Sequence, residues 1–375
     1  MPIVLIAGAV GAPGPPEAPG SAEARGAREA FAALPGPSTA PARVRIRREA
    51  FLMGTLLRLE VEAPSRGRAL RASEAGLRAV RESEERLSTW RSDTELAVLN
   101  AAPPGHPIQL SPELFGLLSE VAGWSARTAG ALDPAVGALV DAWDLRGRGR
   151  RPDPEALGSA LAASGLPCFT LLPGSRSGVR RCPGAWIDAG AFGKGAALRG
   201  ARRALLGAGA RTALLNFGGQ LLLVGEPPQP GGWTVAVAHP GRRAEAVAWL
   251  RVPGGSVATT SASERWVEAG DTRIGHVLDP RTGRPVPPWG GVTVVSDDPL
   301  VADALSTALF VMGPEEGPAW AEREEVAALF LTETASGLAL RASPLIRPLL
   351  GDGPAPVAGA EEAPAALGPG WRRDR

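Results

Sequence analysis

The sequence contains no tyrosine, only three histidines and only two cysteines in 375 residues. Cys168 and Cys182 are too few for a metal cluster or a disulfide framework, and their spacing excludes a CxxC motif. One disulfide between them is compatible with the short, loop-like segment that joins them, and two reduced, inert thiols are at least as compatible. The lack of tyrosine accompanies abundant Ala, Gly, Pro and Arg, a compositional bias that predicts no function.

An excess of charge of either sign is also absent. The 40 Lys and Arg residues nearly cancel the 39 Asp and Glu residues, which leaves a formal net charge of +1. No global field therefore favours binding to nucleic acid or to an anionic membrane surface. We expect no nucleic-acid partner, and any ligand should bind at a local site.

The N-terminal apolar run, residues 2–10, is too short to span a membrane. It lacks the basic segment of a secretory signal and a cysteine for lipid attachment, so a degenerate signal and a disordered tail remain as equal alternatives. Residues 11–41 are rich in Pro, Ala, Gly and Glu without periodicity, and such a segment buries too little surface to fold. We expect a low-complexity tail over residues 1–43 and a second, disordered tail over residues 346–375.

The segment between these tails, residues 44–345, is predicted to form one domain, in which residues 144–184 are a variable surface insertion rich in Gly, Pro and Arg. Strand-like and helix-like patterns do not alternate regularly along it, which favours an α+β fold with an antiparallel or mixed β-sheet core flanked by helices. Strands are expected at residues 44–46, 52–61, 185–188, 213–216, 233–238, 247–252, 256–259, 266–268, 292–295, 326–331 and 338–340. Helices are expected at residues 66–88, 111–127, 135–143, 154–164, 194–206 and 301–313.

The predicted helix at residues 301–313 carries a carboxylate and a hydroxyl four residues apart in an apolar run. Asp303 and Thr307 would share one helix face. Their oxygens suit Mg²⁺ or Ca²⁺, and a Mg²⁺ site of this kind is usually completed by water and phosphate. The alternative is purely structural, with Asp303 near a helix N-terminus and Thr307 bonded back to its own helix.

A small-residue turn at residues 189–195 joins a predicted strand to a predicted helix. The free backbone N–H groups at a helix N-terminus bind anions, and Lys194 would add a cation there. An ordinary first-turn lysine is disfavoured, because a cation at this end opposes the helix dipole. The turn is neither a GxGxxG fingerprint nor a Walker loop, since Gly195 follows the lysine where Ser or Thr is required.

Eight blocks of the sequence are informative when taken in order. They are MGT at 53–55, ERLSTWRSDTELAVLN at 85–100, TAGALDPAVGALVDAW at 128–143, DAGAFGKG at 188–195, NFGG at 216–219, ATTSASER at 258–265, HVLDPRTGRP at 276–285 and ADALSTALFVMG at 302–313. In this order they resemble the FAD:protein FMN transferases, the ApbE-type flavin transferases. Members of that family cleave FAD at its pyrophosphate and join the FMN half to a Ser or Thr of an acceptor protein, releasing AMP.

The resemblance implies roles for single residues. It makes Asp303, Thr307 and the main-chain oxygen of Ala191 ligands of Mg²⁺, and it makes Asp303 a base for the acceptor hydroxyl as well. It brings Lys194 to the FAD phosphates. The FAD pocket would further include a set of less specific positions: Met53, Trp90, Asp188, Thr259, Glu264 and His276.

These pocket residues also have ordinary explanations. An isolated aromatic such as Trp90 is more often part of a core than a flavin platform, and Met53 could serve packing alone. A lone His276 is more often a structural histidine than a catalyst, and we expect it to bind rather than to catalyse.

The sequence departs from the family pattern where Arg199 and Gln220 replace residues that are commonly acidic, and where Thr260-Ser261 replaces Ser-Gly. The first two changes put contacts to the adenosine half of FAD in doubt. They leave open a non-catalytic FAD-binding module as a second function. An FAD pyrophosphatase that yields FMN and AMP is also open, because transfer and hydrolysis differ only in the nucleophile that reaches the phosphorus. By resemblance, the acceptor is a membrane-associated electron-transfer protein, which favours the cell envelope as the location. The weak N-terminal signal and the lack of a lipobox cysteine leave the cytoplasm as the alternative.

Overall fold

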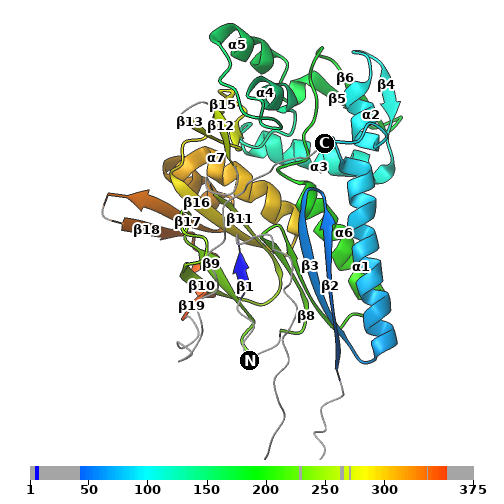
Figure 1. Cartoon of the computed structure of the whole chain (residues 1–375), viewed down its shortest axis with the longest axis vertical. Helices are drawn as coiled ribbons and strands as arrows, with labels where there is room; N and C mark the ends of the chain where they lie inside the picture. The colour runs from blue at the N-terminus through cyan, green and yellow to red at the C-terminus, as the bar shows by residue number, and fades with distance from the viewer. Residues whose placement is uncertain are drawn as a thin grey trace, which may run out of the picture.

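The computed structural model describes residues 5–7, 43–227, 230–261, 266–269, 272–335 and 337–352. Its centre is an eight-stranded sheet, with long helices on one face and a four-stranded sheet on the other (Figure 1). The predicted α+β class is therefore confirmed.

The strands of the large sheet run in the order β18-β17-β16-β11-β8-β7-β3-β2, and every neighbouring pair is antiparallel. Alternation of side chains lets each strand contribute to both apolar layers. The bounds are β2 Val44–Leu52, β3 Thr55–Ala63, β7 Thr212–Phe217, β8 Gln220–Gly225, β11 Gly255–Ser261, β16 Gly290–Ser296, β17 Ala327–Thr334 and β18 Gly337–Ala342.

Three helices cover one face of this sheet, namely α1 (Arg66–Leu87), α6 (Gly193–Gly207) and α7 (Pro299–Arg323). Each buries apolar residues that recur at helical spacing, which is the pattern that pins a helix to a sheet. Helix α1 begins where the Ser65 side chain accepts from a first-turn N–H group. Helix α7 bends at Gly313, whose φ of 78° interrupts the regular backbone.

The smaller sheet packs on the opposite face and has the order β1-β9-β10-β19. Its central strands are β9 (Trp233–Ala238) and β10 (Ala246–Val252), which pair antiparallel. Strand β1 (Leu5–Ala7) runs parallel to β9, and β19 (Leu350–Gly351) pairs with β10.

These edge strands correct the predicted tails. Leu5–Ala7 belongs to a sheet although residues 1–43 were expected to form a low-complexity tail. The fold also continues past residue 345, since Ile346 is fully buried and Leu350–Gly351 pairs with β10. The rest of the predicted tails, except for residues 43 and 347–352, lies outside the described residues.

A second group of elements lies beyond one end of the large sheet, at the top of Figure 1. It contains the helices α2 (Glu95–Ala101), α3 (Pro112–Arg127), α4 (Gly137–Ala142) and α5 (Pro154–Ala162) and the three-stranded sheet β4-β6-β5, with β4 Pro107–Gln109, β5 Phe169–Leu172 and β6 Ser177–Arg180. The remaining short elements are η1 Leu166–Cys168, β12 Trp266–Ala269, β13 Thr272–Gly275, β14 Leu278–Asp279, β15 Arg284–Pro285 and η2 Arg347–Leu349.

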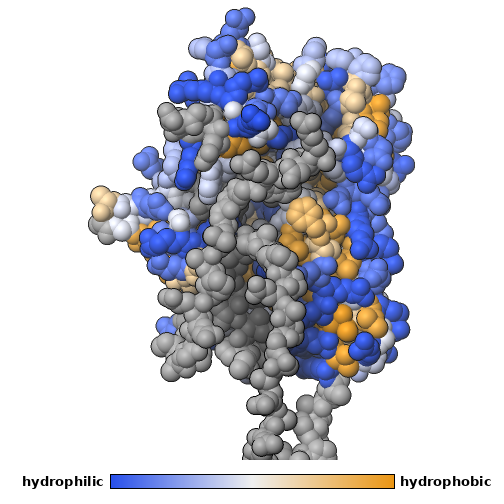
Figure 2. Space-filling model, viewed as in Figure 1, coloured by the Kyte–Doolittle hydropathy of each residue, from blue (hydrophilic) through white to orange (hydrophobic). Residues whose placement is uncertain are grey.

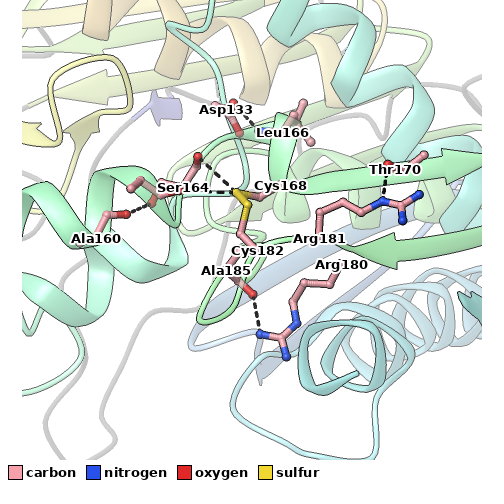
Figure 3. Close-up of a disulfide and its surroundings, with 11 residues drawn as sticks. Asp133, Ala160, Ser164, Leu166, Cys168, Thr170, Arg180, Arg181, Cys182 and Ala185 are labelled. Carbon is pink, nitrogen blue, oxygen red and sulfur yellow. Dashed lines mark hydrogen bonds between the residues drawn. A yellow bond between two sulfur atoms is a disulfide. The ribbon is translucent and has the colours of Figure 1, made fainter. Parts of the chain in front are cut away.

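The predicted insertion at residues 144–184 contains the expected helical piece as α5, and it also contains a β-hairpin. Its β5–β6 hairpin extends β4, and Cys168 and Cys182 form a disulfide (Figure 3). Of the two alternatives for the cysteines, the structure therefore has the disulfide. The bond closes the hairpin a few residues before Asp188, the start of one of the family-like blocks.

Several predicted elements differ from the observed ones. Residues 185–188 do not pair into a strand, and α7 continues to Arg323 beyond the expected end at residue 313. The strands that were not expected include β4, β5, β6, β8 and β13. Strand β8 reads as a continuous apolar run because both of its faces are covered, so it lacks the alternation on which the prediction depended. In the described part of the chain, no helix is long and apolar enough to cross a membrane.

Candidate functional site

Asp303 is held inside the protein by the first turns of two helices. Helix α7 begins at Asp298, whose carboxylate accepts from the Leu300 N–H at 3.0 Å, and Pro299 occupies the first helical position. One turn later the Asp303 residue is 3% exposed. Its Oδ1 accepts from Lys194 Nζ at 2.9 Å and its Oδ2 accepts from the Gly195 backbone N–H at 2.8 Å.

The close approach of the two helices depends on Gly195. A Cβ at this position would lie 2.4 Å from the carbonyl oxygen of Pro299 and 2.8 Å from Cβ of Asp303. Without a side chain, the first turn of α6 can press against α7 and direct its N–H group to the carboxylate. The Gly195 N–H is one of the first-turn groups of α6 that have no partner within the helix, and the Asp303 carboxylate provides one.

Lys194 is the only lysine among the 40 Lys and Arg residues of the chain. Its side chain is 29% exposed, while the Asp303 side chain is 5% exposed. A lysine at the positive end of a helix is unfavourable by itself, and the buried carboxylate compensates for that placement. The ammonium group thus occupies the boundary between the buried acid and the solvent.

Thr307 lies one turn after Asp303, as predicted. Its hydroxyl donates to the Asp303 backbone carbonyl at 3.4 Å, which is the local bonding proposed above as the structural alternative. Ser306, which the sequence analysis did not select, donates to the same carbonyl at 2.9 Å and pairs with the Thr260 hydroxyl at 2.9 Å. These bonds fix α7 against β11 and leave the Asp303 carboxylate directed toward α6.

The donor types assigned to this site fit a hard divalent cation that has few protein ligands. The carboxylate of Asp303, the hydroxyl of Thr307 and the carbonyl of Ala191 are all oxygen donors, as Mg²⁺ prefers. Over the described ranges, no group of three or more His, Cys, Asp or Glu side chains could enclose a metal ion. A cation here would therefore retain waters or take phosphate oxygens, and it would compete with the ammonium group of Lys194 for Asp303.

Met53 lies against the turn that leads into α6. It occupies the β2–β3 hairpin turn with a φ of 48°, and its N–H donates to Glu84 Oε1 at 2.7 Å. Its Cε would be 3.1 Å from a Cβ added to Gly193. A hydrophobic patch appears on the surface in Figure 2 at the place of the β2–β3 hairpin tip of Figure 1, and Phe51 at the end of β2 is 65% exposed. Met53 therefore lies beside Gly193, the residue before Lys194, and its role in the FAD pocket stays a prediction.

Trp90 and Asp188 are joined by Arg146, a residue that the sequence analysis assigned only to the variable insertion. The Arg146 guanidinium donates to Asp188 Oδ2 at 2.7 Å and lies 4.8 Å from the centre of the Trp90 ring. Asp188 Oδ1 accepts from the Gly190 N–H at 2.6 Å, inside the turn that precedes α6. Trp90 is 72% exposed, which excludes the alternative that it belongs to the core.

Thr259 does not reach this site. Its neighbour Thr260 faces α7, so alternation turns Thr259 to the opposite face of the sheet. There its hydroxyl pairs with Thr293 at 2.8 Å and lines a small cavity with His239 and Arg243. Thr259 therefore lies on the face of the sheet away from Asp303, and its role in FAD binding stays a prediction. Glu264 lies outside the described residues.

The turn after His276 is attached to other helices. The indole N–H of Trp143, at the end of α4, donates to the Gly283 carbonyl at 2.7 Å, and Arg281 links Asp279 at 3.0 Å to Glu316 of α7 at 3.3 Å. His276 itself is half-buried between β13 and β14. Its binding role stays a prediction.

Two of the three departures from the family pattern, Arg199 and Gln220, have structural partners. Arg199 donates to Glu120 of α3 at 2.7 Å and to Asp298 at 2.8 Å, and these hydrogen bonds, Glu120 first, raise the pKa of Arg199 above its ordinary value. Gln220 is 2% exposed and its Nε2 donates to the Pro299 carbonyl at 2.9 Å. Both side chains thus hold the N-terminus of α7, which carries Asp303.

The model of the ApbE family matches residues 53–330. The chain belongs to the ApbE family. A Rhodobacter capsulatus protein named FAD:protein FMN transferase is 34% identical over 330 residues, which cover 85% of this chain and 61% of that protein. A Vibrio cholerae protein of the same name is 29% identical over 279 residues, which cover 73% of this chain and 83% of the relative.

Solved structures agree in fold. The flavin transferase ApbE of Vibrio cholerae has a TM-score of 0.72 and 26% identity, with 82% of this chain and all 100% of that chain covered. The ApbE protein of Thermotoga maritima has a TM-score of 0.75 and 25% identity over the same 82% of this chain. The fold and the resemblance inferred from the eight blocks are therefore confirmed.

Proposed function

We propose that this chain is a Mg²⁺-dependent FAD:protein FMN transferase. The acceptor hydroxyl oxygen forms a bond to the phosphorus of the FMN half, and the bond from that phosphorus to the bridging oxygen breaks. AMP leaves with the bridging oxygen, and the hydroxyl proton passes to a base. The names of the relatives and the family match over residues 53–330 support this reaction.

The observation that carries the proposal is the buried Asp303 carboxylate facing a lysine and a helix N-terminus. Transfer between phosphate centres requires charge neutralisation and positioning more than covalent help. Lys194 and the N–H groups of the first α6 turn are suited to neutralise the FAD phosphates. Asp303 would accept the proton of the attacking hydroxyl.

We assign the metal ligands to Asp303, Thr307 and the carbonyl of Ala191. A divalent cation bound there would supply additional charge neutralisation at the pyrophosphate. Trp90 and Met53 would contact the isoalloxazine ring, and His276 would line the remainder of the FAD pocket.

Hydrolysis is the second candidate function, because water in place of the acceptor hydroxyl would give FMN and AMP at the same site. A non-catalytic FAD-binding module is the third, and it is favoured only by the neutral Gln220 and the basic Arg199. The ion pairs of Arg199 give it a structural reason to be present, so its presence does not require loss of activity.

The acceptor is proposed to be a protein with an exposed Ser or Thr, in the family's usual setting a membrane-associated electron-transfer protein. We propose the cell envelope as the location, because disulfides persist in oxidising compartments and the Cys168–Cys182 pair forms one. Alkylation of thiols in intact cells, followed by mass measurement, tests this: modification of both cysteines without prior reduction would contradict it.

The function is tested by incubating the protein with FAD, Mg²⁺ and an acceptor protein, and by measuring acceptor mass and in-gel flavin fluorescence. We expect the acceptor to gain the mass of FMN with the unaltered protein and not with Asp303→Asn. Free FMN and AMP with an unlabelled acceptor would favour hydrolysis. Intact FAD would refute both catalytic functions and leave the binding module.

A further inference from the structure

Arg146 lies in the predicted insertion, yet its side chain contacts residues of the candidate flavin pocket. Its guanidinium reaches two segments that are distant from it in sequence: the loop after α1 and the segment that precedes α6. In the first it contacts Thr89, donating to the backbone carbonyl at 3.1 Å. In the second it pairs with Asp188 at 2.7 Å.

Two indole rings flank the same guanidinium. Its Cζ lies 4.8 Å from the centre of the Trp90 ring and 4.2 Å from that of the Trp186 ring. The Trp186 ring is itself fixed, because its N–H donates to Asp141 at 2.7 Å and a Cβ on Gly137 would lie 2.0 Å from the ring. Arg146 therefore connects the exposed Trp90 to a tryptophan that is anchored on α4.

The contact with Trp90 is the informative one. Trp90 is 72% exposed, so packing does not hold its ring in place. A guanidinium over an indole is attracted by the ring quadrupole and fixes the orientation of the ring. Because the Arg146 guanidinium covers one face of the Trp90 ring, the other face is left for a planar ligand.

The contact with Asp188 acts on the other end of the pocket. Asp188 Oδ1 accepts from the Gly190 N–H at 2.6 Å while its Oδ2 pairs with Arg146. With its second oxygen held, the carboxylate keeps the 188–190 turn in the conformation that leads to Ala191 and Lys194. The Arg146 guanidinium thus contacts both Trp90, the proposed stacking partner of the flavin, and Asp188, which begins the turn before Lys194.

We propose that Arg146 is a positioning residue for FAD, which orients Trp90 for stacking and holds the Asp188–Gly190 turn in place. This inference rests on the proposed function, because it requires FAD in this pocket. Arg146 acts through its two neighbours and not on the reacting phosphorus. Its loss should weaken FAD binding and should leave the rate at saturating FAD much less affected.

The test compares Arg146→Ala, Arg146→Lys and the matched control Arg148→Ala. Arg148 lies two residues later, is exposed, and forms no side-chain hydrogen bond with the described residues, so its replacement removes the same charge alone. We expect the Kd for FAD, measured by equilibrium dialysis without acceptor, to rise about tenfold in Arg146→Ala. Lysine should not restore it, because an ammonium cannot form the forked contacts of a guanidinium.

Further readouts separate positioning from general damage. The KM for FAD should rise with little change in kcat, and the effect of Arg146→Ala on Kd should shrink in a Trp90→Ala background, since part of it acts through that ring. An unchanged Kd in Arg146→Ala, or an equal change in Arg148→Ala, would overturn the role of Arg146 alone. Failure of the unaltered protein to bind FAD would instead overturn the proposed function.

Discussion

Replacing Lys194 by methionine tests whether its ammonium group and a divalent cation compete for Asp303. Methionine keeps most of the apolar stem and removes the charge. The Asp303 residue is 3% exposed, so its carboxylate cannot exchange the lost partner for bulk water. Removing one partner of a buried ion pair costs about 3–5 kcal/mol, and we expect about 2 kcal/mol here because Lys194 is 29% exposed and Gly195 still donates to the carboxylate.

Thermal unfolding in a chelating buffer and in Mg²⁺ measures both effects. Without metal, Lys194→Met should melt about 3 °C below the unaltered protein. With Mg²⁺ the variant should gain more stability than the unaltered protein, because the cation replaces the missing charge without displacing an ammonium group. The double variant with Asp303→Asn serves as the control and should gain the least. Equal melting temperatures without metal, or equal gains in Mg²⁺, would refute the competition.

A chemical probe reports the same event in the unaltered chain. Because Lys194 is the only lysine, an amine-selective reagent can modify only this side chain and the N-terminal amine. Release of the ammonium group from Asp303 exposes it, so Mg²⁺ should accelerate its modification, as followed by peptide mass. Slower or unchanged modification in Mg²⁺ would show that the cation does not enter at Asp303.

Two further substitutions test the close packing at Gly195 and the effect of burial on the carboxyl group of Asp133. Gly195→Ala places a Cβ 2.4 Å from the Pro299 carbonyl and should cost about 3 kcal/mol in urea unfolding, whereas Gly207→Ala, with no atom within 4 Å of the added Cβ, should cost nothing. Burial raises the pKa of Asp133 above its ordinary value, so the native state holds this proton more tightly and the stability contribution falls as pH rises from about 4. Asp133→Asn should lack that fall, and parallel pH profiles of the unfolding free energy for the two proteins would contradict it.

Local signals in the sequence, such as capping residues, were sufficient to predict the bounds of α3 and α6 to within one residue. Helix α3 begins at Pro112, directly after Ser111, whose hydroxyl accepts from the Leu114 N–H at 3.1 Å. Such capping chemistry is local, so the expected range, 111–127, matched the observed helix to within a residue. The same holds for α6, whose expected start at Lys194 was off by one residue.

Contacts between segments that are distant in sequence could not be predicted from such local signals. Strand alternation predicts that Thr259 and Thr260 face opposite sides, but only the packing of α7 decides which of them faces Asp303. Arg146 was missed because its partners, Thr89 and Asp188, lie 57 and 42 residues away. An arginine in a Gly- and Arg-rich loop carries no local mark of such contacts.

The ion pair between Lys194 and Asp303 would also link the affinity for the divalent cation to the affinity for FAD. Lys194 satisfies the buried Asp303 and cannot at the same time bind a phosphate with full strength. A cation at Asp303 would free the ammonium group for the FAD phosphates, and phosphates at Lys194 would free the carboxylate for the cation. Each ligand would remove the competitor of the other, so the two affinities should rise together by the same factor. A single lysine between a buried acid and the solvent can thus make FAD binding depend on the metal without any movement of the fold.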